Sequence, residues 1–542
     1  MTPGYEKPRP YIAPSQHHRS RNIHQTRATE GYLYDELILH RTSEAFTAMV
    51  GAHGKGQKQH ELDGDDVWTV PSPRRAPWPG VTRESGQALS DALRANHERF
   101  HVFFNPEAFH NHIAHYVTSV WALGAPPEVI RAAFEVLVPE QQPAFDSPGA
   151  VTRESFNEHL GDHRYWKAYN AFFADVLRKK TIGEVLEEYV FDPRMNFGVY
   201  GEGKGPEMLN RFLDGLLHPI IHTGYGIELG VPGLTIEGLS SAAVHKGIAS
   251  VLIPPSLWQP KTKGRKGVHA FTILARILKD SRFENVEPNL VPSDDAAVYD
   301  RSLPLYGAAV MEYANEWSYD MSAPGEVERK IEELVYMTTL MYGIGGYEAG
   351  HEYNADFFNV HLVNSSLFLT TVAQLLKPSS QEMLLRGYLA VCLIWWVSRG
   401  LPWFDIAGFY AHVTEYPLPS GPLAPAYVPA LLNPNSPKAI TPNPWFHIIE
   451  HALVNPDDHL PKMQRALAHF ASVYGMRTAG EDDFNGTELK GAERLDGSLF
   501  LRVAGITKAR LVRLRELSAE GPRYWDRVGL YDKQRRSTRA ML

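Results

Sequence analysis

Apolar positions recur at helical spacing along most of the chain from Glu84 onward. In the segment SGQALSDALRANHERFH, Leu89, Leu93 and Phe100 fall at helix-like intervals. Alternation of period two and two-residue hairpin signals are scarce. The pattern therefore predicts an all-α protein with short Gly- and Pro-containing connectors. The further segments expected to be helical are 106–124, 126–137, 163–178, 206–222, 240–252, 270–278, 327–341, 355–376, 381–398, 462–473 and 508–517.

The helical pattern is interrupted at both ends and at one internal site. Residues 1–84 are polar and rich in proline, and we expect an N-terminal extension that is partly disordered. Residues 417–444 contain nine prolines, which lack the amide donor that regular structure needs. This stretch is expected to be a long surface loop. We therefore predict one large helical domain over 85–525 that includes the loop, followed by a disordered basic tail over 526–542.

The composition of the chain argues against several classes of function. The net charge of −8 and the absence of a Lys/Arg-dense body argue against a nucleic-acid partner. The single cysteine, Cys392, excludes a disulfide framework and a cysteine-based metal site. The longest apolar stretch, Tyr388 to Val397, is about half the length that a bilayer requires, and residues Met1 to Arg27 lack the apolar region of a secretory signal. These features predict a cytoplasmic protein without a membrane partner.

Histidine is unusually abundant, with 24 residues, and five of them lie within 19 positions. Helix geometry predicts that His97 and His101 share one face and that His112 and His115 share another, whereas His110 and His112 point apart. Imidazole rings on one helical face can bind Fe, Zn or Cu. The alternative is that each ring is a core residue that bonds a backbone carbonyl.

Further histidines occur in apolar surroundings. His218 and His222, in GLLHPIIHTGYG, have the i, i+4 spacing that suits two ligands of one metal, and Glu228 could orient one of their rings. His361 is a single polar ring on an apolar stripe, a pattern more typical of a core histidine. Three Glu-x-x-His spacings offer a rival di-iron chemistry: Glu98/His101, Glu107/His110 and Glu348/His351.

Other signals of chemistry are weak. No glycine-rich nucleotide-binding motif follows a strand pattern, and no GxSxG nucleophile elbow occurs. Asp457 or Asp458, which precede KMQRALAHF, are predicted to cap a helix N-terminus.

Five blocks in this order resemble the questin oxidase-like family, which includes anthraquinone ring-opening and Baeyer–Villiger-type oxidoreductases. The blocks span about 380 residues and are more specific together than any single motif. They are NHERFHVFFNPEAFHNHIAHYVTSVWALGAPPEVI (96–130), FNEHLGDHRYWKAYNAFF (156–173), GLLHPIIHTGYGIELG (215–230), DFFNVHLVNSSLFL (356–369) and NPWFHIIEHALVNPDDHLPKMQRALAHFASVYG (443–475).

The resemblance implies an oxidoreductase that oxidises or ring-cleaves a polycyclic aromatic polyketide, such as an anthraquinone, with O₂. It also implies NADPH as a co-substrate in some members and, in at least one, a non-haem Fe(II) held by four histidines and a carboxylated lysine. The histidines available for that role are His101, His112, His115, His218, His222 and His361. We favour His112, His115, His218, His222 and His361 as metal ligands, because three separate helices would then converge on a buried, histidine-lined pocket.

The lysine expected from the resemblance is missing at its aligned position, where Tyr388 stands. Lys377 lies nearby at a predicted helix end and is a poor substitute. The tyrosine would then be a core residue whose hydroxyl bonds a histidine. Two alternatives to the iron enzyme therefore remain, an NADPH-dependent Baeyer–Villiger-type oxidase without a metal and a non-catalytic helical binding protein.

Overall fold

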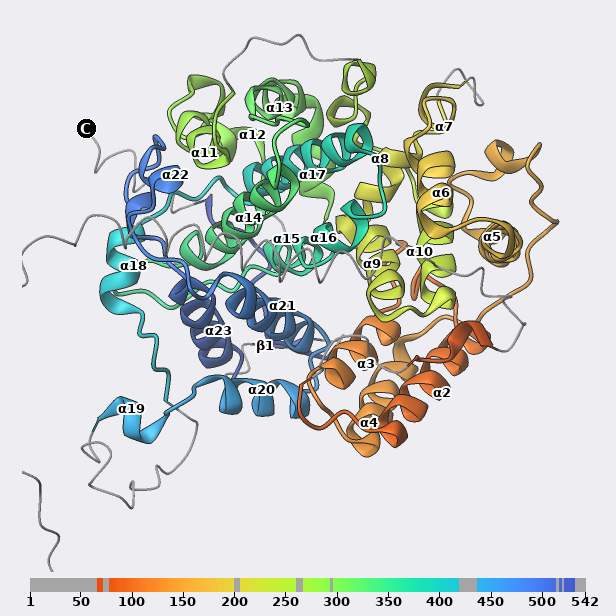
Figure 1. The fold of residues 1–542 in the computed structure, drawn as a ribbon, viewed down its shortest axis with the longest axis horizontal. Helices are drawn as coiled ribbons and strands as arrows, with labels where there is room; N and C mark the ends of the chain where they lie inside the picture. The colour runs from red at the N-terminus through yellow and green to blue at the C-terminus, as the bar shows by residue number, and fades with distance from the viewer. Residues whose placement is uncertain are drawn as a thin grey trace, which may run out of the picture. The chain divides into compact units, whose positions relative to one another are not determined.

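A computed structural model describes residues 66–71, 78–198, 205–259, 267–292, 296–418, 436–512, 516–518 and 521–531. All of them belong to one compact unit, Gln59–Leu542. The prediction of an all-α fold is confirmed (Figure 1). The described part adds two three-residue antiparallel strands, β1 (Glu516–Ser518) and β2 (Gly521–Arg523).

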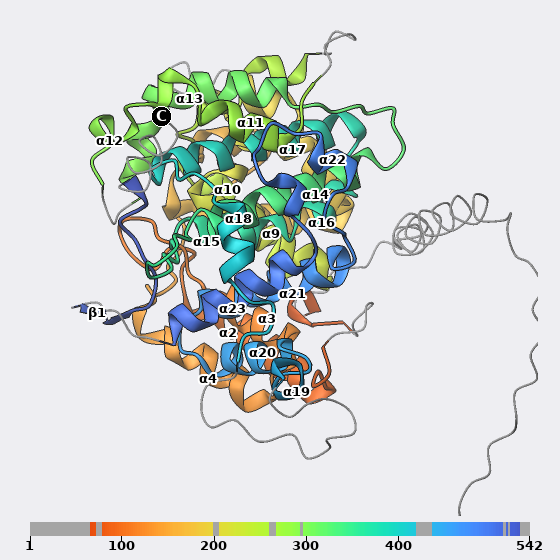
Figure 2. The same cartoon turned by 90° about the vertical axis from the view of Figure 1, so that its left-hand side faces the viewer.

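The helices form groups that meet around a common centre (Figures 1 and 2). One end holds α2 (Arg83–Arg99), α3 (Ile113–Ala122), α4 (Pro127–Leu137) and α20 (Trp445–Val454). The opposite end holds α11 (Ala270–Ile277), α13 (Ala297–Glu316) and α17 (Pro378–Ser398). Between them lie α9 (His218–Leu229), α14 (Glu326–Thr339), α15 (Asn359–Ser366), α16 (Leu369–Ala373), α21 (His459–Tyr474) and α23 (Ser498–Leu511).

Shorter helices and one further layer complete the unit. The helix α10 (Pro232–Val244) packs between α9 and α5 (Trp166–Lys179). The remaining α-helices are α6 (Ile182–Leu186), α7 (Arg194–Phe197), α8 (Met208–Leu213), α12 (Val286–Asn289), α18 (Ile406–His412), α19 (Pro437–Ile440) and α22 (Asp482–Asn485).

The longest described helix, α17, is buried along nearly its whole length. It contains the apolar stretch Tyr388–Val397, including the fully buried Cys392, and has no polar face. A helix that is apolar all round belongs in the middle of a large core. No helix among the described residues is both long and apolar enough to cross a membrane.

Several predicted helices are shorter than the sequence pattern indicates. Residues 106–112 are not helical, because His110 pairs with Phe103 in an isolated antiparallel bridge, and α3 begins only at Ile113. The segment 206–222 is broken at residues 214–217, where Leu216 and Leu217 have positive φ angles of 54° and 64°. The segment 355–376 divides into α15 and α16. The helix α13, which contains Pro304, was not predicted.

The proline-rich stretch also differs in part from the expected irregular loop. The one-turn helix α19 lies within it, and Pro437 occupies the first helical position, where the missing amide costs nothing. The first residues of the expected tail, from Asp526 to Tyr531, are packed on the body, because Asp526 accepts hydrogen bonds from the amide of Ala355 and from Arg510. The rest of the loop, tail and N-terminal extension, at 1–65, 72–77, 419–435 and 532–542, lies outside the described residues.

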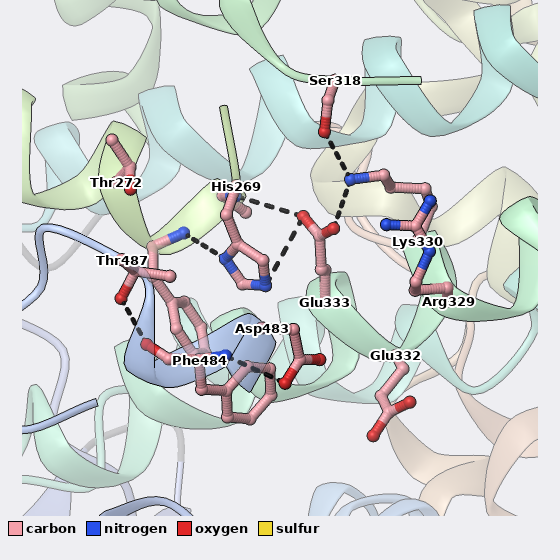
Figure 3. A network of polar contacts seen from close by, with 12 residues as sticks. His269, Thr272, Ser318, Arg329, Lys330, Glu332, Glu333, Asp483, Phe484 and Thr487 are labelled. Atoms are coloured by element: carbon pink, nitrogen blue, oxygen red, sulfur yellow. Dashed lines mark hydrogen bonds and ion pairs between the residues drawn. The ribbon is translucent and has the colours of Figure 1, made fainter. Parts of the chain in front are cut away.

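One buried carboxylate connects α11, α13 and α14 (Figure 3). Glu333 accepts hydrogen bonds from the Trp317 indole at 2.8 Å and from the amide of Ala270 at 3.1 Å, and it forms an ion pair with Lys330. The Lys330 ammonium is 1% exposed and also donates to the Ser318 hydroxyl at 2.8 Å. The charge of Glu333 is therefore neutralised inside the protein.

We predict that Lys330→Met lowers the free energy of unfolding by about 3–5 kcal/mol, because it leaves the Glu333 carboxylate buried without its cation. Adding Glu333→Gln should recover most of this loss, since a glutamine oxygen still accepts from Trp317. The measurement is urea unfolding of both variants. Lys179→Met, in an exposed pair with Asp175, is the control and should cost at most about 1 kcal/mol. Equal losses in the single and double variants would contradict the prediction.

Candidate functional site

Six histidine rings gather in the centre of the protein, where α3, α9, α15 and α21 meet. The expected convergence of His112, His115, His218, His222 and His361 is observed, and His459 joins them. Neighbouring rings have centroids 4.7 to 6.5 Å apart across the group. We call these six residues the histidine cluster.

Four members form the inner part of the cluster. The Nε2 atoms of His112 and His218 are 2.7 Å apart. One ligand atom each from His112, His361 and His459 can be chosen so that all three lie within 4.8 Å of one another. The rings of His218 and His361 are 5.0 Å apart, as are those of His361 and His459. Three of the four can therefore present one nitrogen each to a common point, and His218 lies against one of those three.

Backbone carbonyls fix two of these rings. The Nδ1 atom of His218 lies 2.7 Å from the carbonyl oxygen of Gly215, and the Nδ1 atom of His361 lies 3.0 Å from that of Phe357. A carbonyl oxygen only accepts, so each Nδ1 carries the proton and each Nε2 presents a lone pair to the cluster.

Asp458 fixes the other two rings. Its Oδ2 lies 3.0 Å from Nδ1 of His112, and its Oδ1 lies 2.9 Å from Nδ1 of His459. Lys462 donates to the same carboxylate at 2.7 Å. Burial opposes the charge of Asp458, but His459 and Lys462 hold the pKa of this carboxyl well below its usual range. An ionised Asp458 therefore accepts from both rings and leaves their Nε2 lone pairs directed inward.

These lone pairs are the unusual feature of the site. The Nε2 atoms of His361 and His459 are buried and have no hydrogen-bond partner. At His112 and His218 two acceptor nitrogens face each other, an arrangement that is repulsive unless a cation or a proton lies with them. Neutral imidazoles with converging lone pairs form the donor set that Fe(II), Zn²⁺ and Cu²⁺ prefer. The residues present thus fit a metal ion.

The other two histidines form an adjoining chain of hydrogen bonds. The Nε2 of His115 lies 3.1 Å from Nδ1 of His222, whose Nε2 lies 2.9 Å from Oε2 of Glu237. The other oxygen of Glu237 lies 2.8 Å from Nδ1 of His97. Burial opposes its ionisation, but the hydrogen bonds of His222 and His97 lower the pKa of Glu237 to about 2. Both nitrogens of His222 are therefore bonded, to His115 and to Glu237, whereas the buried Nδ1 of His115 has no hydrogen-bond partner.

Burial keeps the imidazole rings of the histidine cluster uncharged. Burial is the main cause that lowers the pKa of His112, His115, His218 and His361. It lowers the pKa of His459 to about 4. Neighbouring histidines and Lys462 act in the same direction. Neutral rings are what metal coordination requires.

All four inner histidines lie at the starts of helices. His112 caps α3, His218 and His459 are the first residues of α9 and α21, and His361 is the third residue of α15. The positive ends of four helix dipoles therefore face one region, which favours neutral imidazole and nearby negative charge.

Several expectations about the site are corrected. His101 does not share a helical face with His97, because α2 ends at Arg99, and its Nε2 bonds the carbonyl of His163 at 3.0 Å. Glu228 pairs with Arg465 at 2.5 Å rather than with a histidine. Glu237 takes the orienting role instead.

Tyr388 is a buried core residue, but its hydroxyl does not bond a histidine. It donates to the carbonyl of Leu362 at 2.7 Å and contacts the hydroxyl of Ser365 at 2.8 Å. The lysine beside the cluster is Lys462, which is 3% exposed. Lys377 lies at the exposed start of α17 and pairs with Glu187.

The sequence interpretation missed Asp458, His459 and Lys462. The capping role predicted for Asp457 or Asp458 belongs to Asp457, whose Oδ1 accepts from the amides of His459 and Leu460. Because capping explained these aspartates, the sequence indicated only a structural role for the segment PDDH (456–459). The available signal was the sequence DHLPK, which places Asp458, His459 and Lys462 on one helical turn.

Comparisons with known proteins identify the family to which the chain belongs. The model of the questin oxidase-like family matches residues 109–467, a range that contains the whole histidine cluster. A questin oxidase of Aspergillus terreus is 24% identical over 70% of this chain and 79% of its own length. A Baeyer–Villiger oxidase of Pestalotiopsis microspora is 27% identical over 62% of this chain and 75% of its own. The oxidoreductase AflY of Aspergillus parasiticus is 26% identical over 80% and 81%. The chain therefore belongs to the questin oxidase-like family and is an oxidoreductase.

Proposed function

We propose that this oxidoreductase oxidises a polycyclic aromatic ketone of polyketide type, such as an anthraquinone, with O₂ at an Fe(II) ion. The ion would be held by Nε2 of His112, His218, His361 and His459. The observation that carries the proposal is the convergence of four buried lone pairs whose rings are each fixed by an outer partner. The names of the relatives support the substrate class and an oxygen-insertion reaction.

The chain's own residues have distinct roles in this proposal. Asp458 and the carbonyls of Gly215 and Phe357 orient the four rings. The bound Fe(II) would supply binding and activation of O₂. Lys462, buried beside Asp458 and the histidines, would act as an ammonium that holds Asp458 ionised, and not as the carboxylated lysine that the family resemblance implies.

The number of electrons that the reaction needs decides whether NADPH takes part. Insertion of one oxygen atom from O₂ requires two electrons and two protons to reduce the other atom to water, and NADPH with a proton supplies them. Incorporation of both atoms requires no external reductant. The ratio of NADPH to O₂ consumed therefore distinguishes the two reactions.

We predict that anaerobic reconstitution of the purified protein loads about one Fe(II) per chain. His361→Ala and His459→Ala should each abolish most of this iron. His101→Ala removes a buried histidine outside the cluster and should leave loading unchanged. Inductively coupled plasma mass spectrometry measures the iron, and thermal unfolding checks that each variant is folded. Less than about 0.2 iron per wild-type chain would contradict the metal site.

Replacing Asp458 by Asn should weaken Fe(II) binding by about 10- to 100-fold, because an amide oxygen cannot accept from both Nδ1–H groups with full negative charge. The matched control is Asp457→Asn, which keeps the oxygen that caps α21. We expect its Fe(II) affinity to stay within about threefold of the wild type. Competition with a fluorescent chelator measures both affinities. Equal losses in the two variants would show that Asp458 has no specific role.

Questin, the compound in the names of two relatives, is the first substrate to test. We predict O₂ consumption that depends on questin and on bound iron. An oxygen electrode with and without NADPH gives the stoichiometry. Full activity of EDTA-treated, iron-free protein would instead support a metal-independent oxidase. Absence of O₂ consumption with questin and with further anthraquinones would contradict the proposed substrate class.

A further inference from the structure

A cavity of about 500 Å³ lies along one face of α5. The α5 residues that line it are spaced three or four positions apart and so share that face over about 16 Å. They include Ala168, Ala171, Phe172, Asp175 and Lys179. Residues 150–153, Lys180 and Tyr189 complete the lining. We call this cavity the α5 pocket.

The α5 pocket does not belong to the histidine cluster. The helix α5 packs on α10 at the outside of the helical body (Figure 1). No residue of the lining is a cluster member or orients one of its rings. The volume of the pocket is within the usual range for sites that bind small molecules. A ligand in the α5 pocket would therefore meet chemistry different from that of the histidine cluster.

One end of the α5 pocket is apolar. Val151, Ala168 and Phe172 line it and are buried, whereas Ala171 is exposed at its opening. The rings of Phe172 and Tyr189 meet edge to face, with centroids 5.5 Å apart and an interplanar angle of 78°. Small alanine side chains beside fixed aromatic rings leave an apolar surface on which an alkyl chain can pack.

The other end carries an excess of positive charge. Among the described charged residues of the lining, Arg153, Lys179 and Lys180 are cations and Asp175 is the acid. Lys179 pairs with Asp175 at 2.7 Å, so these two charges cancel. Arg153 and Lys180 share a single acid, Glu188, with one cation on each carboxylate oxygen. One positive charge of this pair therefore remains without a compensating acid in the lining.

Two hydrogen-bond donors lie at the cationic end. The contact of Arg153 with Glu188, at 2.8 Å, uses one terminal nitrogen of the guanidinium, which carries further N–H groups. Burial and then the nearby Glu188 raise the pKa of the Tyr189 hydroxyl, although Arg153 opposes them. This hydroxyl is therefore a donor at neutral pH. Glu154, the next residue after Arg153, is exposed and does not line the pocket.

We propose that the α5 pocket binds the anion of a free, unbranched fatty acid. Its alkyl chain would lie against Phe172 and the alanines, and its carboxylate would accept from Arg153 and Tyr189. A pocket that follows three turns of a helix, with positive charge at one end only, suits an extended amphiphile better than a fused-ring compound. The site goes beyond the proposed oxidation and does not depend on it.

Calorimetric titration with two matched probes tests the α5 pocket. Decanoate and the neutral decan-1-ol are titrated, at concentrations too low for micelles or droplets, into EDTA-treated full-length protein, so that no metal ion attracts the carboxylate. We expect the wild type to bind decanoate at least about tenfold more tightly than decan-1-ol. Ala171→Trp places a large side chain in the opening and should weaken the binding of both probes by at least about tenfold.

Two substitutions should change the decanoate affinity in opposite directions. Arg153→Gln removes the guanidinium and should weaken decanoate binding by about tenfold, while decan-1-ol binds as before. Glu188→Gln removes the acid that Arg153 and Lys180 share and should strengthen decanoate binding by about threefold or more. A variant that had merely lost structure would not gain affinity.

Matched control variants lie on α4. Arg131→Gln and Ala132→Trp change exposed residues of the same kinds outside the lining of the pocket. Both controls should bind decanoate and decan-1-ol with wild-type affinity. Circular dichroism and thermal unfolding establish that each variant is folded.

Four outcomes would overturn the α5 pocket as a fatty-acid site. They are no binding of decanoate, equal wild-type affinity for the two probes, binding that persists in Ala171→Trp, and no gain of decanoate affinity in Glu188→Gln. None of these measurements involves iron or oxidation. Failure of this site is therefore distinguishable from failure of the proposed function, which iron loading and O₂ consumption report separately.

Discussion

The arrangement of the central histidine rings depends on one requirement, that buried imidazole nitrogens have partners. Each ring nitrogen that leaves water needs a donor, an acceptor or a cation in exchange. At the four inner histidines, two carbonyls and one carboxylate satisfy the Nδ1 side and thereby fix the tautomer. The Nε2 side is left with converging lone pairs, two of which have no partner in the described structure. Under the proposed function, an Fe(II) ion would accept these lone pairs.

Four helices contribute to the histidine cluster with their first turns rather than with their middles. Ahead of α9 the chain turns sharply at Leu216 and Leu217, which have positive φ angles. A residue in the first turn presents its ring beyond the helix end, so four helices can contribute to one site without their backbones colliding. Asp458 at the start of α21 offsets the positive helix ends. It also gives the cluster the negative charge that a bound cation requires.

The C-terminal segment is part of this arrangement rather than an appendage. Asp526 pairs with Arg510 and bonds the backbone on both sides of Asp356, and Trp525 donates its indole N–H to Asp457 at 2.9 Å. These contacts place Arg527 beside the histidine cluster although it lies 68 positions after His459 in the chain. The segment thereby places the Arg527 guanidinium over the ring of Phe357, which contacts His361 and His459.

The sequence by itself determined the helical class, the family and five of the six clustered histidines, because helical periodicity and ordered blocks are local signals. It also indicated Asp457 or Asp458 as a helix cap, and the structure assigns the role to Asp457. Only the tertiary structure decided how the histidines divide: His459 joins the inner group, while His115 and His222 turn to each other and Glu237. The helix break at residues 214–217 was equally inaccessible, whereas the spacing in DHLPK could have pointed to Asp458 and Lys462. The physical reason is that a ring nitrogen's role depends on which distant carbonyl, carboxylate or imidazole it meets, and spacing along the chain does not encode that meeting.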